Sequence, residues 1–207
     1  MQHKVKVTVI DKKLYPELQA QYCADPDSGV CPCYQVGDEF IFERYGDADD
    51  FWHMGLNTLR QTANAAGNTA GNTDENTAGY TAGGSAFPHC SEAWDAISRY
   101  IYTGLQGGSI MRGWMNDERV MIACCSDGTR PVIFKIERMD YIAVYFDNNS
   151  DVNCEDQIRE AFMQIHGVES VDIREKYAEV YLIENVEDDV LKQAAESRGA
   201  CKVLRVE

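Results

Sequence analysis

Alternating apolar and polar residues open the chain and predict a β-strand. Valines alternate with lysine and threonine over residues 4–9, the period expected when one face of a strand is buried. We expect a short helix over 16–22, then a second strand over 39–44 whose two phenylalanines share one face. These elements predict the start of an α+β domain.

Helical spacing returns after residue 90. Large apolar residues recur every three or four positions from Trp94 to Leu105, which predicts a helix over 91–105 that Ser91 and Glu92 can cap. Two β-rich runs follow, at 120–125 and 132–137.

The turn between these two runs is Ser126-Asp127-Gly128-Thr129. It predicts a hairpin, because Asp-Gly suits a backbone with positive φ, and Asp127 is explained by turn chemistry alone. We place the end of this first domain near Asp140.

The remaining chain, 141–207, has the element order βαββαβ. The predicted strands are 142–146, 170–174, 178–183 and 202–206, with helices at 154–165 and 186–198. Each helix carries one apolar face, made of Ile158, Ala161, Phe162 and Ile165 and of Val190, Leu191, Ala194 and Ala195. The predicted fold class is therefore α+β: a cysteine-bearing α+β domain over 1–140, followed by a ferredoxin-like βαββαβ sandwich over 141–207.

A low-complexity stretch over 57–86 interrupts the first domain. It is rich in Asn, Thr, Ala and Gly, and it repeats Asn-Thr-Ala-Gly at Asn68 and Asn76. Such a composition buries too little apolar surface to offset the entropy lost on ordering. We interpret the stretch as a flexible insertion without a function of its own.

The charge of the chain limits its partners. There are 34 acidic against 19 basic residues, a net charge of −15, so nucleic acid and anionic membrane surfaces are expected not to bind. No run of about 20 apolar residues occurs, and the chain begins with a strand pattern rather than a signal peptide. These features predict a cytoplasmic protein.

Eight cysteines are the main candidate chemistry. In a cytoplasmic chain they are expected to be reduced, as metal ligands, redox groups or small packed side chains. Cys31 and Cys33 lie two residues apart, so an extended segment would direct both thiols to the same side, as binding of a soft metal requires.

Cys90 directly precedes the helix over 91–105, where the helix dipole favours a thiolate. It is the predicted reactive cysteine. Cys124 and Cys125 are adjacent in a strand, so the pleat directs them to opposite faces and only one can join a cluster. Ordinary packing of small side chains remains the alternative for all of these cysteines.

The C-terminal part carries Gly167-Val168-Glu169-Ser170-Val171 and therefore resembles the heavy-metal-associated domain of copper chaperones and metal-pumping ATPases. That family binds a soft ion through a Cys-x-x-Cys loop before its first helix. The resemblance places the second cysteine at Cys154, but Asp151 stands where the first belongs. Because a carboxylate is a poor ligand for Cu(I), we expect weak binding, unless Cys201 at the start of the last strand completes the site. Otherwise Asp151 caps the helix and Cys201 packs beside it.

The first domain resembles an uncharacterised prokaryotic family of small cysteine-containing proteins. The matching segments are the opening strand, Cys31-Pro32 with the Val36–Phe40 run, Cys90-Ser91 with Trp94, and Ile122–Val132. That family has no established chemistry, so the resemblance implies a shared fold only.

Three functions are compatible with these residues. The leading hypothesis is a protein that binds a soft metal ion (Zn, Cu or Fe) or a thiol-reactive ligand through Cys31, Cys33, Cys90 and Cys124, with the C-terminal domain for docking or weak coordination at Asp151, Cys154 and Cys201. The second is a thiol-dependent oxidoreductase in which Cys90 attacks and another cysteine resolves. The third is a protein-interaction scaffold that self-associates through free sheet edges of the C-terminal domain.

Overall fold

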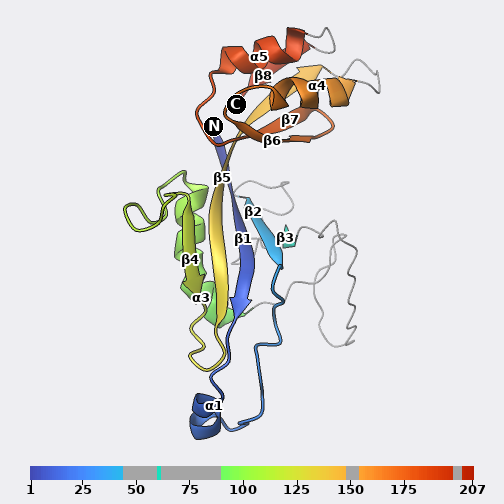
Figure 1. The fold of residues 1–207 in the computed structure, drawn as a ribbon. Helices are drawn as coiled ribbons and strands as arrows, with labels where there is room; N and C mark the ends of the chain where they lie inside the picture. The colour runs from blue at the N-terminus through green and yellow to red at the C-terminus, as the bar shows by residue number, and fades with distance from the viewer. Residues whose placement is uncertain (44–59, 62–89, 148–153, 198–201) are drawn as a thin grey trace. The chain divides into compact units, whose positions relative to one another are not determined.

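The computed structural model describes residues 1–43, 60–61, 90–147, 154–197 and 202–207 (Figure 1). Its elements in chain order are β1 (Gln2–Lys12), α1 (Pro16–Tyr22), β2 (Glu39–Glu43), β3 (Arg60–Gln61), α3 (Ser91–Leu105), β4 (Val120–Cys124), β5 (Val132–Asp147), α4 (Cys154–Met163), β6 (Val168–Ile173), β7 (Tyr177–Leu182), α5 (Asp188–Ser197) and β8 (Lys202–Val206). The mixture of helices and antiparallel strands confirms the α+β class. Within these residues no helix is long and apolar enough to cross a membrane.

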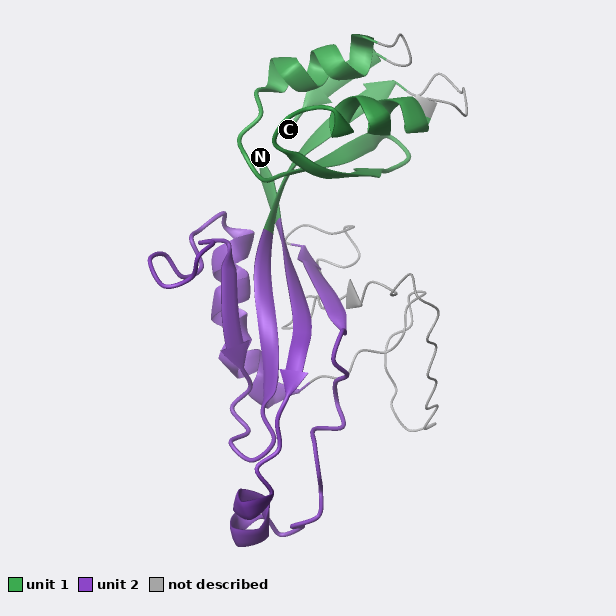
Figure 2. Ribbon diagram, in the orientation of Figure 1, with its two compact units in different colours: residues 1–3, 139–207 green, residues 4–138 purple. Residues whose placement is uncertain are grey.

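The chain divides into two compact units (Figure 2). Unit 1 contains residues 1–3 and 139–207, and unit 2 contains residues 4–138. The long strand β5 contributes its first half to unit 2 and its second half to unit 1. Each unit has its own apolar core.

Unit 2 is a sheet with the long helix α3 against one face (Figure 1). The described strand order is β3-β2-β1-β5-β4. The alternating valines predicted for the first strand are fully buried at positions 5, 7 and 9, and Phe40 and Phe42 of β2 are buried on the same side. Ile97 and Ile101 of α3 cover them, so the predicted amphipathic helix is confirmed.

The other face of this sheet is polar. Lys4 of β1 forms an ion pair with Glu43 of β2, with Nζ and Oε1 3.0 Å apart. Lys6 lies 3.9 Å from Glu39 and 3.7 Å from Glu137. Alternation of valine with lysine along one strand therefore produces a buried apolar face and a charged face.

Strand β5 corrects one prediction. The sequence pattern indicated separate strands at 132–137 and 142–146, but the structure has one strand of 16 residues, Val132–Asp147. No glycine or proline interrupts residues 138–141, so nothing ends the extended backbone there. The strand changes partner instead: β4 pairs with it up to Glu137, and β7 pairs with it from Asp140 onward.

Unit 1 has the predicted element order. Its strands are arranged β8-β5-β7-β6, and every neighbouring pair is antiparallel. Helices α4 and α5 contribute Ile158, Phe162 and Leu191 to one core with the inward residues of the sheet. Val190, predicted to face this core, is exposed.

Gly167 makes the turn before β6. Its φ is 94°, a left-handed conformation that favours glycine, and a Cβ added there would lie 3.2 Å from Val186 Cγ2. The left-handed backbone and the nearby Val186 side chain thus explain why a glycine begins the Gly-Val-x-x-Val segment.

The hairpin of unit 2 differs in part from what the sequence predicts, and the predicted insertion is described at two residues. Most of the insertion predicted at 57–86 lies outside the described residues, and Arg60 and Gln61 within it pair with β2 as β3. The predicted hairpin after β4 is present, yet Gly128 does not adopt positive φ. The Asp127 carboxylate holds the turn, because its Oδ1 accepts hydrogen bonds from the backbone nitrogens of Thr129 (2.8 Å) and Arg130 (3.2 Å).

Candidate functional site

Four cysteines gather at one part of the unit 2 core. Cys125 is buried in it, Cys31 and Cys90 are half-buried and pack against it, and Cys33 is exposed beside Cys31. We call Cys31, Cys33, Cys90 and Cys125 the thiol cluster. Its members come from three segments: the loop before β2, the start of α3 and the end of β4.

Tyr34 fixes the loop that carries Cys31 and Cys33. Its ring is buried and meets Phe40 and Phe134 edge-on, with ring centroids 6.1 and 5.4 Å away. Its carbonyl accepts a hydrogen bond of 2.6 Å from Lys12 Nζ. Burial, followed by the charges of Cys90, Cys33, Cys31 and Cys125, raises the pKa of the Tyr34 hydroxyl. One buried ring therefore anchors a loop whose thiols reach the surface.

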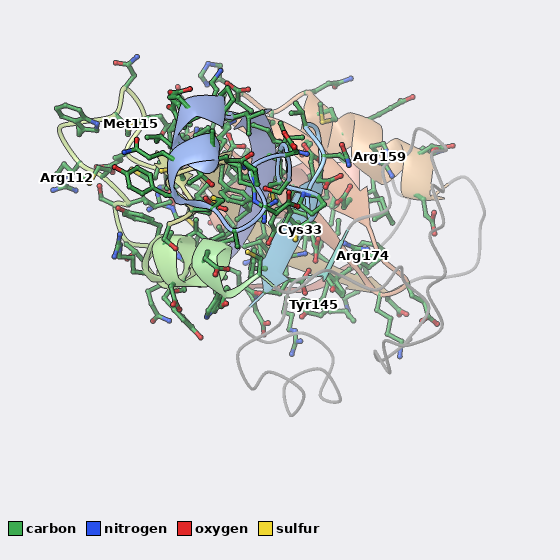
Figure 3. All side chains as sticks on the ribbon, turned by 90° about the horizontal axis from the view of Figure 1, so that it is seen from below. Cys33, Arg112, Met115, Tyr145, Arg159 and Arg174 are labelled. Atoms are coloured by element: carbon green, nitrogen blue, oxygen red, sulfur yellow. The ribbon has the colours of Figure 1, made fainter. Side chains whose placement is uncertain are left out.

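The two loop thiols interact directly. Burial, then the charge of Cys31 and a hydrogen bond with it, raises the pKa of Cys33, with a smaller contribution from Cys90. The positive charge of Arg130 acts in the opposite direction. Figure 3 marks Cys33 in unit 2. The segment that carries Cys31 and Cys33 bends at residues 32 and 33, whereas the expectation from the sequence is based on an extended one.

Cys90, the predicted reactive cysteine, is the N-cap residue of α3. Burial and a hydrogen bond from its Sγ to Glu92 Oε2 (3.4 Å) raise its pKa. Backbone groups at the start of the helix lower the pKa of Cys90, but by less than burial and Glu92 raise it. The acidic neighbour two residues later thus opposes the helix dipole. The role of Cys90 as a reactive cysteine stays a prediction.

The adjacent cysteines 124 and 125 separate as the pleat predicts, with Cys125 facing the cluster. Cys124, included among the predicted metal ligands, is exposed, whereas Cys125 is buried and its Sγ accepts a hydrogen bond of 3.3 Å from the Val132 nitrogen. The Ser126 nitrogen donates to the carbonyl oxygen of Glu92 at 3.3 Å, which joins the hairpin to the start of α3.

No metal site with three or more ligands is formed among the residues that the structure describes. Among residues 1–43, 60–61, 90–147, 154–197 and 202–207, no three His, Cys, Asp or Glu side chains are grouped so that they can hold a metal ion. The arrangement instead offers two adjacent sulfurs, Cys31 and Cys33. Two thiolates suit a soft ion of low coordination number or a reversible disulfide.

The second predicted site, in unit 1, lies mostly outside the described residues. Asp151 and Cys201 fall there, and Cys154 is described only as the first residue of α4. Lys202, the first residue of β8, pairs with Asp147, the last residue of β5, so the end of the first strand and the start of the last strand of unit 1 are neighbours.

Sequence reasoning missed two neighbours of the thiols, Tyr34 and Arg130. Tyr34 follows Cys33 directly, and an aromatic residue beside a Cys-x-Cys pair can be suspected of anchoring the loop. The sequence carries no signal for Arg130, because only the hairpin brings it near Cys33. Its Nε donates to Asp127 Oδ2 at 3.1 Å.

Unit 1 carries a polar network on the sheet face away from its helices. Glu179 of β7 is buried there, and its carboxylate accepts hydrogen bonds from the Tyr181 hydroxyl (2.8 Å) and from Arg174 Nη2 (3.2 Å). Tyr141 and Tyr181 pack with ring centroids 5.5 Å apart, and Tyr145 and Tyr177 with centroids 5.1 Å apart. Figure 3 marks Tyr145 and Arg174.

Comparison with known proteins adds no assignment. No family model, no curated protein and no solved structure matches the chain. The candidate function therefore rests on the residues and geometry described above.

Proposed function

We propose that unit 2 binds a soft metal ion, or a small molecule that reacts with two thiols, through Cys31 and Cys33. The observation that carries the proposal is a pair of thiols two residues apart in one loop, with Cys31 packed against the core and Cys33 exposed. Cu(I) is the ion of choice for a test, because thiolate ligands select it and two sulfurs satisfy it. A structural zinc site would need about four ligands.

The surroundings of the pair support this role. Burial and Cys31 raise the pKa of Cys33, and the positive charge of Arg130 opposes that increase in favour of the thiolate, which is the form that binds metal. Tyr34 holds the loop against the core, so the two sulfurs are positioned before an ion arrives. Cys90, half-buried nearby, is proposed as an auxiliary sulfur that approaches on binding.

For unit 1 we infer a ferredoxin-like fold that serves for docking or weak ion coordination. The inference is supported by the βαββαβ order, by the strand order β8-β5-β7-β6 and by two helices packed in one core with the sheet. The resemblance to heavy-metal-associated domains is compatible with this arrangement. It gives unit 1 a proposed role as the second module of a metal-handling protein.

The test is a competition titration of the full-length, reduced chain with a chromophoric Cu(I) chelator in the absence of oxygen. The parent chain is expected to take up one Cu(I) at unit 2. Cys31→Ser and Cys33→Ser are each expected to weaken that binding by at least about two orders of magnitude, because each removes one of two sulfurs. Cys90→Ser should weaken it by about tenfold.

Cys124→Ser is the matched control, since it removes an exposed thiol whose side chain lies on the face of β4 opposite the core. It is expected to bind as the parent does. Equal affinity in the parent and in the Cys31→Ser, Cys33→Ser double variant would refute the proposal.

A further inference from the structure

We propose that Cys31 and Cys33 also form a reversible disulfide, by exchange with a low-molecular-weight disulfide such as glutathione disulfide. The reaction uses the thiols of the proposed function. Only its predicted effect on ion binding rests on that function. It assigns the redox chemistry of unit 2 to this pair, with no part for Cys90.

The spacing of the two residues permits the bond. Consecutive Cα atoms are about 3.8 Å apart, so two steps span at most about 7.6 Å, and any bend shortens that distance. The backbone bends at Pro32 and Cys33. A disulfide needs Cα atoms about 4.4 to 6.8 Å apart, a range that a bent Cys-x-Cys segment can reach.

Exposure assigns the order of attack. Cys33 is exposed and Cys31 is half-buried, so the thiolate of Cys33 meets the incoming disulfide first. It forms a bond to one sulfur of glutathione disulfide and releases one glutathione thiolate. Cys31, as a thiolate, then attacks the Cys33 sulfur and releases the second glutathione. In total the protein loses two electrons and two protons, and glutathione disulfide gains both as two glutathione thiols.

The other members of the thiol cluster are less suited to this exchange. The Cys90 thiol donates a hydrogen bond to Glu92. The carboxylate of Glu92 repels an incoming thiolate or acidic peptide. Cys125 is buried, and its sulfur accepts a hydrogen bond from the Val132 nitrogen. The exposure of Cys33 and the position of Cys31 two residues before it thus select the pair in the loop.

The disulfide would also control the proposed site. Both sulfur donors are consumed when the bond forms, so an oxidised chain can no longer bind Cu(I) at unit 2. Under reducing conditions the same thiols are free again. Ion binding at this loop is therefore expected to follow the thiol–disulfide balance of its surroundings.

The experiment exposes the reduced, full-length chain to a series of glutathione to glutathione disulfide ratios without oxygen, followed by an acid quench, alkylation and peptide mass mapping. In the parent, the peptide carrying 31–33 is expected to lose two hydrogens and to resist alkylation, and reduced glutathione should reverse this. Cys31→Ser should accumulate a glutathione adduct on Cys33. Cys33→Ser should form at least about tenfold less adduct at Cys31.

Cys124→Ser and Cys90→Ser are expected to form the disulfide as the parent does. The inference is overturned if residues 31–33 stay reduced while Cys124 is modified, or if Cys31→Ser forms a disulfide between Cys33 and Cys90. Cu(I) binding of the reduced chain is measured separately. Binding without exchange defeats only this inference, and exchange without binding defeats only the proposed function.

Discussion

The hydroxyl of Tyr181 donates a hydrogen bond of 2.8 Å to the carboxylate of Glu179, two residues earlier in the same strand. Both side chains are buried on the sheet face away from the helices of unit 1, and Arg174 also donates to Glu179. A buried carboxylate is tolerated only when its oxygens have partners of this kind. The network therefore makes Glu179 a structural residue.

Glu179→Ala is expected to lower the free energy of unfolding by about 1 to 3 kcal/mol, because it removes the carboxylate that accepts the hydrogen bond of the buried Tyr181 hydroxyl. Urea denaturation measures the change. Glu175→Ala is the matched control, since Glu175 is exposed and should change stability by less than about 0.5 kcal/mol. An equal, small effect of both substitutions would contradict this role for Glu179.

Unit 1 is expected to lose stability at alkaline pH through Tyr181. Burial, then the charge of Glu179, raises the pKa of Tyr181 in the folded chain, so the unfolded chain releases that proton first. The free energy of unfolding should therefore fall as the pH rises beyond the ordinary tyrosine pKa of about 10. Urea unfolding at several pH values from about 8 to about 10.5 tests this. Tyr181→Phe should show a smaller decrease, and an identical decrease would argue against this assignment.

Gly104 marks a close approach of α3 to β1. A Cβ added at this position would lie 2.6 Å from Val5 Cγ2, and Val5 is fully buried. Although alanine stabilises a helix by about 1 kcal/mol relative to glycine, Gly104→Ala is expected to destabilise unit 2 by about 1 to 3 kcal/mol.

Val5→Ala provides the control for Gly104→Ala, because it removes the Val5 methyl group that a Cβ at position 104 would meet. In a double-mutant cycle the coupling free energy should be favourable by about 0.5 to 3 kcal/mol. Additive effects of the two changes would show that the contact is not the cause.

The fold was largely predictable because its periodicities are strong. Valines at positions 5, 7 and 9 and the spaced apolar residues of α3 indicated buried faces that the structure contains. The length of β5 was not predictable, because its change of partner from β4 to β7 depends on long-range pairing. Pattern alone separates strands only where a turn residue is present.

The candidate site was predictable only in part. The position of Cys31 and Cys33 in one loop follows from their spacing, and the pleat separates Cys124 from Cys125 without saying which faces inward. The environment of Cys90 was not predictable from its position before a helix, because burial and the Glu92 carboxylate raise its pKa against the effect of the helix backbone, and burial depends on packing. Electrostatic environments of this kind depend on the folded arrangement of distant segments.

A cysteine at position 151 should create a stronger Cu(I) site, as the resemblance to heavy-metal-associated domains predicts. In a chain that lacks the unit 2 pair through Cys31→Ser and Cys33→Ser, Asp151→Cys is expected to raise Cu(I) affinity by several orders of magnitude, because it supplies a second thiolate three residues before Cys154. Competition with the chromophoric Cu(I) chelator measures this. If the chain with Asp151 already competes as well, then Cys201 or another group completes the site.

The central claim, that Cys31 and Cys33 bind a soft ion, is tested most directly by alkylation of the individual cysteines. The reduced chain is treated with an alkylating reagent with and without one equivalent of Cu(I), and each cysteine is followed by peptide mass mapping. Bound Cu(I) should slow alkylation of Cys31 and Cys33 by at least about tenfold, because a coordinated thiolate is a poor nucleophile, and should leave Cys23 and Cys124 unchanged. Equal alkylation of Cys31 and Cys33 with and without the ion would contradict the account.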